Sequence, residues 1–377
     1  MIYKTFQDKK LSALGMGCMR FPTVEGNFKN IDEEKTAQMI DYAISHGVNY
    51  FDTAYMYHGG QSEIVLGKML KKYPRDSFYV ADKFPGVDLT AFGRVEEIFA
   101  EQLNKVGVEY FDFYLLHCVC ENNIEQYLDE EKKYGTVEYL LEQKRQGKIG
   151  HLGFSAHAEL ETMRRLLEKY GDVMEFCQLQ INWLDWTYEQ AKEKVELLKE
   201  YNIPVWVMEP VRGGRLAQLS PEYESKLKAL RPDESMAAWA FRFLQTALDC
   251  TVVLSGMSNF EQVQENIQIH SEEKPLNAEE MQALQTIVDD LLGKLTPCTG
   301  CRYCTEYCPQ GLDIPMLLNR YNEYKCAFGG VLIERLMVRI PEGKRPADCL
   351  QCKVCEGVCP QKIAISDELA KFAELAK

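Results

Sequence analysis

The sequence predicts an α/β protein in which a (β/α)8 barrel, the TIM-barrel architecture, is followed by a small cysteine-rich domain. The first observation is that short apolar segments alternate with longer amphipathic ones over the first three-quarters of the chain. Eight such units, 25 to 47 residues apart, each have the length of one strand plus one helix. The second observation is that nine of the 14 cysteines lie between Cys298 and Cys359. Cysteines clustered in this way indicate metal ligands before disulfides.

The predicted strands are short apolar runs, which end near Cys18, Asp52, Lys83, His117, Ser155, Gln180, Met208 and Ser255. Amphipathic spacing predicts helices over 34–46, 93–106, 189–201 and 236–246, and a closing helix over 278–293. Thr296-Pro297 then marks a boundary, so we expect a barrel domain at 1–295 and a cysteine-rich domain at 296–377. A doubly wound sheet is the alternative, but no Gly-x-Gly-x-x-Gly turn follows the first strand.

Composition restricts the classes of partner. The 377 residues are 46% hydrophobic and 27% charged, which supports a sizeable core. The net charge of −14 argues against nucleic acid or an anionic membrane as the main partner. No apolar run approaches the roughly 18 residues that span a bilayer, and the first residues lack the apolar stretch of a secretory signal. We therefore expect a cytoplasmic protein.

Two cysteine motifs of identical spacing dominate the tail. They are Cys298-x2-Cys301-x2-Cys304-x3-Cys308-Pro309 and Cys349-x2-Cys352-x2-Cys355-x3-Cys359-Pro360. Zinc sites use two Cys-x-x-Cys pairs and need no third and fourth cysteine before a proline, so iron–sulfur ligation is favoured over zinc or disulfides. The module resembles bacterial-type ferredoxins, with a longer insert at 310–348 between the motifs.

The resemblance to ferredoxins implies two [4Fe–4S] clusters, each with three ligands from one motif and the fourth from the other. One cluster would take Cys298, Cys301, Cys304 and Cys359, and the second would take Cys349, Cys352, Cys355 and Cys308. Two such clusters suggest a relay for single electrons, with a ferredoxin-like protein as a candidate donor. The alternative is that the clusters only stabilise a small domain.

Four residues with chemically useful side chains lie at or just after predicted strand ends, where barrel enzymes place catalysis. They are Asp52, Tyr57, Lys83 and His117. Because buried charges need partners, a carboxylate, an amine and an imidazole that close apolar strands indicate one shared site. A structural Asp–Lys pair beside a core histidine is the alternative.

These segments resemble the aldo–keto reductase superfamily, a (β/α)8 family that moves hydride between NAD(P)H and a carbonyl. The resemblance covers roughly residues 10–266. It rests on GMGCMR at 15–20, NYFDTAYMY at 49–57, YVADK at 79–83, FYLLH at 113–117, GFS at 153–155, QLQIN at 178–182, EPVRGGRL at 209–216 and GMSN at 256–259. With the tail, the whole chain resembles the ferredoxin-fused subgroup of that superfamily.

The resemblance implies a catalytic tetrad made of Asp52, Tyr57, Lys83 and His117. Tyr57 would deliver a proton to the carbonyl oxygen while hydride reaches the carbon. Lys83, held as a cation by Asp52, would lower the pKa of Tyr57 toward neutral, and His117 would orient the substrate. Tyr55 is a rival acid, but it lies three residues after Asp52, where the family motif uses five.

The same resemblance implies a nicotinamide site, in which Ser155 and Gln178 bind the carboxamide. A loop after Met208 suits a pyrophosphate, unless it is a plain surface turn, and a segment after Ser255 suits the adenosine phosphate. The residues expected in these two stretches are Arg212, Gly213, Gly214, Arg215, Gly256, Ser258, Asn259, Gln262 and Asn266. Gln262 stands where the family often has an arginine for the 2′-phosphate, which favours NADH over NADPH. A flavin that replaces or assists nicotinamide stays open.

We therefore expect an oxidoreductase that reduces a small-molecule carbonyl, or oxidises an alcohol, with NAD(P)H, and that carries two clusters for electron transfer. Nicotinamide delivers two electrons as hydride, whereas clusters pass one at a time. A cluster-fed reductase linked to a flavin or a ferredoxin is therefore a second hypothesis. A redox-neutral lyase or isomerase that uses the tetrad as acid and base is a third. Cys118 and Cys120, beside His117, are either redox-active or inert thiols.

Overall fold

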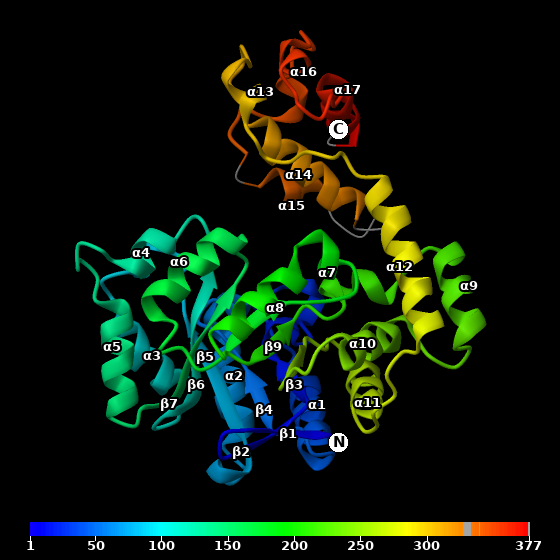
Figure 1. Ribbon diagram of the computed structural model, residues 1–377. Coiled ribbons are helices and arrows are strands. Elements are labelled where there is room, and N and C mark those ends of the chain that lie inside the picture. Colours follow the sequence, from blue (N-terminus) through cyan, green and yellow to red (C-terminus); the bar gives the residue numbers. More distant parts are fainter. Residues whose placement is uncertain (327–332, 339, 376–377) are drawn as a thin grey trace. The chain divides into compact units, whose positions relative to one another are not determined.

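The computed structural model describes residues 1–326, 333–338 and 340–375 (Figure 1). The chain divides into two compact units. The first contains Met1–Gly213 and Ala237–Leu276, and the second contains Gly214–Met236 and Asn277–Lys377. The helix expected at 278–293 groups with the second unit. Among the residues described, no helix combines the length and the apolar character that a bilayer crossing requires.

Eight parallel strands close into a barrel in the first unit, which confirms the predicted fold class. The strands pair in the order β10-β3-β4-β5-β6-β7-β8-β9. Their bounds are β3 (Leu14–Gly17), β4 (Tyr50–Asp52), β5 (Tyr79–Phe84), β6 (Phe111–Val119), β7 (Ile149–Ala156), β8 (Cys177–Gln180), β9 (Val205–Met208) and β10 (Val253–Ser255). Each strand ends within two residues of its predicted end, because the apolar runs are the buried strands themselves.

The helices of the barrel unit are α1 (Glu33–Ser45), α2 (Gln61–Leu70), α3 (Val95–Val106), α4 (Ile124–Leu128), α5 (Thr136–Arg145), α6 (Leu160–Tyr170), α7 (Asp185–Tyr188), α8 (Ala191–Glu200), α10 (Met236–Ala247) and α11 (Phe260–Ile269). Four of them, α1, α3, α8 and α10, begin and end within about two residues of the predicted bounds, and the other helices were not predicted individually. In α6 the buried residues Met163, Leu166, Leu167 and Tyr170 follow the helical repeat and face the barrel. Side-chain caps begin two helices, since Asp32 accepts from Lys35 N at α1 and Asn259 accepts from Gln262 N at α11.

An antiparallel hairpin, which the sequence analysis did not predict, precedes the barrel. It consists of β1 (Tyr3–Phe6) and β2 (Lys9–Ser12). The buried ring of Phe6 lies 4.9 Å from Trp206 and 5.9 Å from Phe113, measured between ring centroids. Because these partners lie near the amino ends of β9 and β6, the hairpin plugs the amino ends of the strands. The carboxyl ends are then the ends at which a site can form.

The second unit is helical. Its members are α9 (Pro221–Leu230), α12 (Ala278–Gly293), α13 (Tyr303–Glu306), α14 (Ile314–Lys325), α15 (Ile333–Met337), α16 (Val354–Gly357) and α17 (Ile365–Leu375). A bidentate ion pair joins Arg231, just after α9, to Glu280 in α12, with both N–O distances at 2.7 Å. An apolar core that includes Leu312, Leu317 and Leu369 packs against the cysteines of both motifs. The short helices α13 and α16 start at equivalent points of the two motifs, as the identical spacing would require.

Candidate functional site

A buried ion pair between neighbouring strands lies at the centre of the barrel site. Asp52 ends β4 and pairs with Ala81 of β5, so Lys83, two residues further along β5, points to the same face as Ala81. The Lys83 ammonium is fully buried, forms an ion pair with the Asp52 carboxylate and donates to the Thr53 carbonyl at 2.7 Å. Burial alone would lower the pKa of Lys83, but the Asp52 charge outweighs burial and raises that pKa above its usual value. The lysine is therefore charged.

Tyr57 lies beside this ion pair, in the turn that follows β4. The Lys83 amine is 5.0 Å from the centroid of the Tyr57 ring. The expectation that the pKa of Tyr57 falls toward neutral is wrong for this structure. Loss of hydration at the half-buried hydroxyl raises the pKa to about 12, although the charge of Lys83 acts in the predicted, lowering direction. The phenol therefore keeps its proton at neutral pH.

His117, in β6, faces Tyr57. The two ring centroids are 5.9 Å apart and the ring planes cross at 80°. Burial, together with the charge of Lys83, lowers the pKa of His117 well below its usual value, so the imidazole is neutral. Its Nδ1 is buried and has no hydrogen-bond partner among the described residues. The structure thus brings together all four residues of the predicted tetrad.

Tyr55, the rival acid, does not join this group. Its hydroxyl donates a 2.8 Å hydrogen bond to Glu101, on α3. The adjacent turn places Tyr57 beside Lys83 instead.

Two of the expected nicotinamide residues lie in β7 and β8, the next two strands of the barrel. Gln178, in β8, donates from Nε2 to Asp52 Oδ2 at 3.0 Å. The Ser155 hydroxyl, in β7, accepts from the Cys118 amide at 2.8 Å. Both residues are buried. Gln178 therefore connects the tetrad to the expected nicotinamide site, a contact that the sequence analysis did not foresee.

The two arginines of the expected pyrophosphate loop are already engaged. The Arg212 guanidinium is buried and forms an ion pair with Asp185, at 3.0 and 3.1 Å from its two carboxylate oxygens. Arg215 belongs to the second unit, where it lies 3.5 Å from Glu323. The loop itself is tightly turned, since Gly213 and Gly214 have φ of +68° and +95°, which glycine adopts without strain.

The expected adenosine-phosphate segment connects β10 to α11. The Ser258 amide donates to the side chain of Gln262 at 2.7 Å, and the Gln262 amide donates to Asn259 at 2.9 Å. Buried Asn266 donates to the Ser255 hydroxyl at 2.9 Å. Gly256 begins this segment and is exposed. These contacts hold the amino end of a ten-residue helix at the carboxyl end of a barrel strand.

Arg20 is a candidate that the sequence analysis missed. Its exposed side chain lies close to two glycines of the expected cofactor loops, Gly213 and Gly256. A Cβ at Gly256 would approach its Cδ to 3.0 Å, and a Cβ at Gly213 would approach its Nη2 to 3.1 Å. The residue stands in the GMGCMR motif, but an arginine in a loop has no periodicity that reveals its neighbours. Only the closed barrel brings the ends of β3, β9 and β10 together.

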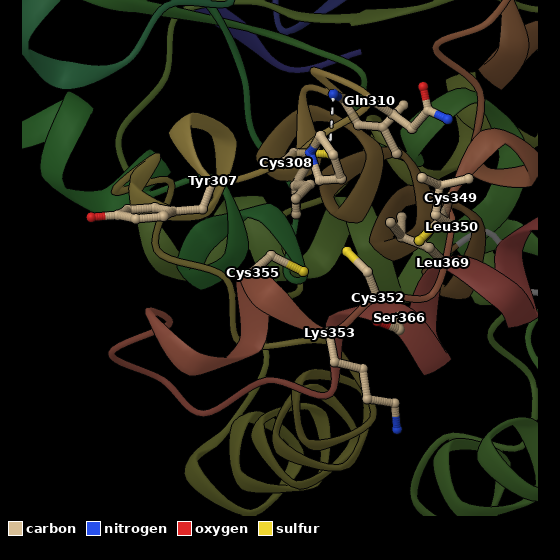
Figure 2. Close-up of a pocket in the computed structure, with 13 residues that line it drawn as sticks. Tyr307, Cys308, Gln310, Cys349, Leu350, Cys352, Lys353, Cys355, Ser366 and Leu369 are labelled. Atoms are coloured by element: carbon tan, nitrogen blue, oxygen red, sulfur yellow. Dashed lines mark hydrogen bonds between the residues drawn. The ribbon is translucent and has the colours of Figure 1, made fainter.

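The eight motif cysteines form two cavities in the second unit. Cys308, Cys349, Cys352 and Cys355 line the first. Figure 2 shows the sulfur atoms of Cys352 and Cys355 pointing toward one another across it. Cys298, Cys301, Cys304 and Cys359 line the second. Each cavity thus combines three cysteines of one motif with the fourth cysteine of the other.

The surroundings of the cavities suit an iron–sulfur cluster. Backbone amides of Leu312 and Gln351 donate to the sulfurs of Cys308 and Cys349 at 3.4 Å. Apolar side chains such as Leu312 and Leu369 complete the lining of the first cavity. Within the described part of the chain, no three His, Cys, Asp or Glu side chains meet closely enough to bind a single metal ion.

Comparison with known proteins identifies the family. The model of the aldo/keto reductase family matches residues 13–289, and a 4Fe-4S dicluster domain matches residues 297–365. The chain belongs to the aldo/keto reductase family, and it is an oxidoreductase with a 4Fe-4S domain.

Two curated relatives agree with this assignment. Probable aldo-keto reductase 1 of Glycine max is 29% identical over 218 residues, which are 55% of this chain and 58% of that protein. The chain thus spans less than two-thirds of that relative. The uncharacterized oxidoreductase YqkF of Bacillus subtilis (strain 168) is 26% identical over 308 residues, 74% of this chain and 93% of the relative.

Solved structures share the barrel. The holo form of aldo-keto reductase AKR11C1 from Bacillus halodurans is 26% identical, with a TM-score of 0.60 over 76% of this chain and 96% of its own. An aldo-keto reductase from Klebsiella pneumoniae, solved in complex with NADPH, has the same TM-score, coverage of 76% and 96%, and 21% identity. This last likeness concerns the fold alone.

Proposed function

We propose that the barrel transfers hydride between NAD(P)H and a small-molecule carbonyl, with Asp52, Tyr57, Lys83 and His117 as its catalytic group. The observation that carries this proposal is the charged Lys83, held by Asp52 beside the neutral Tyr57. An amine kept charged inside a barrel is costly to bury. The Lys83 ammonium lies next to the Tyr57 phenol, where it can stabilise the phenolate that forms when Tyr57 gives up its proton.

The four side chains divide the chemistry between them. When bound, the nicotinamide supplies the hydride for the carbonyl carbon. Tyr57 donates its proton to the oxygen on which negative charge develops, because an alkoxide is a much stronger base than a phenolate. Lys83 stabilises the negative charge that then rests on the Tyr57 oxygen, and Asp52 keeps Lys83 charged and oriented. Neutral His117 donates a hydrogen bond to the same substrate oxygen and orients it.

The residues around this group fit a nicotinamide ring. Gln178 uses one amide N–H on Asp52, which leaves its carbonyl oxygen and second N–H for a carboxamide. Ser155 accepts one hydrogen bond and can donate its own proton. His117 Nδ1 is buried and lacks a partner among the described residues, so it can bond to a bound molecule.

For the phosphates we propose Arg20 together with the amino end of α11. The amino end of a helix attracts anions, and α11 begins here with Asn259 as its cap. The exposed guanidinium of Arg20 adds a cation between Gly213 and Gly256. Arg212 instead orients the loop, since its charge is matched by Asp185.

In the second unit we propose two [4Fe–4S] clusters, one in each cysteine cavity, that carry single electrons from a ferredoxin-like donor. Four cysteines line each cavity, and within the described residues no three of them lie close enough to bind a single metal ion, which supports a cluster rather than one zinc ion with its sulfurs about 2.3 Å away. Amide-to-sulfur hydrogen bonds and apolar linings are the features that set the potentials of such clusters.

Tyr57→Phe should separate catalysis from binding. The variant keeps the ring but loses the proton donor, so we expect turnover to fall by roughly 100-fold or more while the Kd for the nucleotide hardly changes. Steady-state rates and a fluorescence titration measure the two quantities. Tyr55→Phe is the matched control and should keep nearly full activity. Full activity in Tyr57→Phe would show that another group delivers the proton.

Arg20→Ala should weaken nucleotide binding. A lost charge-assisted hydrogen bond costs about 1.5–3 kcal/mol, so we expect the Kd to rise about tenfold or more. An increase for NADPH alone would assign Arg20 to the 2′-phosphate, and an increase for both nucleotides would assign it to the pyrophosphate. Arg94→Ala, which removes an exposed arginine paired with Glu97, is the control. Unchanged affinity for both nucleotides would contradict the assignment.

Cys301→Ser should empty one cavity and leave the other. If each cavity holds one cluster, iron per chain falls by about half. The measurement is iron and sulfide analysis of protein purified without oxygen. Cys250→Ser, in the barrel, is the control and should leave the iron unchanged. The ligand assignment fails if Cys301→Ser retains all of its iron.

A further inference from the structure

Two cysteines sit directly beside the catalytic group and have no part in the mechanism above. Cys118 follows His117 within β6, and Cys120 lies one residue beyond the end of that strand. Both side chains are half-buried. The strand is irregular here, because its pairing with β7 shifts between Leu116 and Val119. Cys118 has a φ of +55°, in the left-handed region that residues other than glycine rarely adopt.

One buried side chain fixes this irregular turn. Asn123 donates from Nδ2 to the Cys118 carbonyl at 2.9 Å, and its Oδ1 accepts from the Cys120 amide at 2.9 Å. The same Nδ2 donates to the Gly86 carbonyl at 3.0 Å. Asn123 therefore holds the backbones of both cysteines and ties them to the loop after β5.

The two thiols are within reach of one another. Residues two positions apart are separated by at most about 7 Å between their Cα atoms, and a disulfide needs about 4.4–6.8 Å. The turn at Cys118 brings the side chains into a hydrogen bond, which lowers the pKa of Cys120 to about 6. Burial has the opposite effect on Cys250, whose pKa is raised to about 12. The lowered pKa of Cys120 favours the thiolate, which is the reactive form.

We propose that Cys118 and Cys120 form a reversible dithiol–disulfide pair, a modification site beside the active site that takes a small hydroperoxide as its oxidant. The Cys120 thiolate attacks one peroxide oxygen; an S–O bond forms, the O–O bond breaks, and the leaving oxygen takes a proton to give water or an alcohol. The Cys118 sulfur then attacks the sulfenic sulfur of Cys120. The S–S bond forms, the S–O bond breaks, and hydroxide leaves with the Cys118 proton as water. The sulfurs lose two electrons, which the peroxide gains.

The pair is coupled to the site through the backbone. The Cys118 amide donates to the Ser155 hydroxyl, and Tyr127 donates to the His117 carbonyl at 3.0 Å. A disulfide between positions 118 and 120 constrains the turn that these hydrogen bonds hold. Oxidation therefore displaces His117, which orients the substrate, and a dithiol reductant returns His117 to its original position. This consequence rests on the proposed function, whereas the formation of the disulfide does not.

The first test is a map of the disulfide in the full chain, purified without oxygen. The protein is treated with one equivalent of hydrogen peroxide, alkylated and digested with trypsin, and its peptide 106–132, which contains both cysteines, is weighed. We expect this peptide to lose two hydrogens and escape alkylation, and to regain two alkylable thiols after dithiothreitol. Iron content is measured on the same sample and must stay constant, so that cysteines from the clusters do not contribute. Two alkylated cysteines after peroxide would overturn the proposal.

The variants Cys118→Ser and Cys120→Ser identify the attacking sulfur, and Cys250→Ser is the control. Cys118→Ser stops the reaction at the sulfenic acid, so dimedone should label Cys120. Cys250→Ser, which removes a half-buried thiol of raised pKa elsewhere in the barrel, should form the disulfide as the wild type does. Absence of a dimedone adduct at Cys120 in Cys118→Ser would contradict the assigned order. If dimedone then labelled Cys118 in Cys120→Ser, Cys118 would be the attacking sulfur.

The coupling has its own readout. Nucleotide-dependent carbonyl reduction should fall by roughly 10- to 100-fold in the oxidised wild type, since small displacements of positioning groups cost rate steeply. Dithiothreitol should restore the rate, and Cys120→Ser should not respond to peroxide. Unaltered activity of protein whose disulfide has been mapped would overturn the coupling. Absence of activity in the reduced wild type would instead refute the proposed function, and the peptide map would still report on the cysteine pair.

Discussion

The barrel site depends on a single ammonium group that has been removed from water. Lys83 has no exposed surface, and its charge is matched by the Asp52 carboxylate and the Thr53 carbonyl. Loss of one partner of a buried ion pair costs about 3–5 kcal/mol, because the other charge remains without compensation. The pairing of β4 with β5 sets the position of this pair, and closure of the barrel brings Gln178 from β8 to the second oxygen of Asp52. Fold and site are therefore fixed by the same strand register.

Much of this arrangement could be predicted from the sequence, for identifiable reasons. The strands of a closed parallel barrel are buried on both faces, so they occur as short apolar runs, and polar residues such as Asp52 and Lys83 mark their ends. The exchange of fourth ligands between the cysteine motifs is what the resemblance to ferredoxins implies, and the structure places Cys308 in the cavity that the second motif lines. Local pattern suffices wherever the contacts follow from strand order or from a repeated motif.

Other features depend on contacts between distant segments. The β1–β2 hairpin is short and half polar, and it is stabilised by the burial of Phe6 and Leu11 against distant residues such as Trp206. The sequence places Arg212 in the expected pyrophosphate loop but does not reveal that Asp185 pairs with its guanidinium. The pKa of Tyr57 could not be predicted either, because it depends on how far burial outweighs the charge of Lys83. These contacts and this pKa depend on residues that are distant in the sequence, so the spacing of motifs does not predict them.

The chain places its cysteines in two contrasting environments. The motif cysteines face cavities lined by apolar residues such as Leu312, which suits clusters that pass one electron at a time. Cys118 and Cys120 lie instead in a turn held by Asn123, and the hydrogen bond from Cys118 lowers the pKa of Cys120, which favours its thiolate. A dithiol–disulfide couple exchanges two electrons, the same number that a hydride carries. The motif cysteines thus lie where one-electron transfer by clusters is proposed, and Cys118 and Cys120 lie beside the site where two-electron hydride transfer is proposed.

Lys83 remains a cation inside the barrel because the Asp52 carboxylate offsets its loss of hydration. Heteronuclear NMR of protein labelled with ¹⁵N at the lysine side chains, with Lys83→Met to assign the signal, measures this directly. The Lys83 signal should be that of an ammonium throughout the neutral range in the wild type. In Asp52→Asn, where burial is no longer outweighed, the amine should lose its proton at a lower pH than in the wild type. A neutral amine in the wild type, or a titration that Asp52→Asn leaves unchanged, would contradict the account.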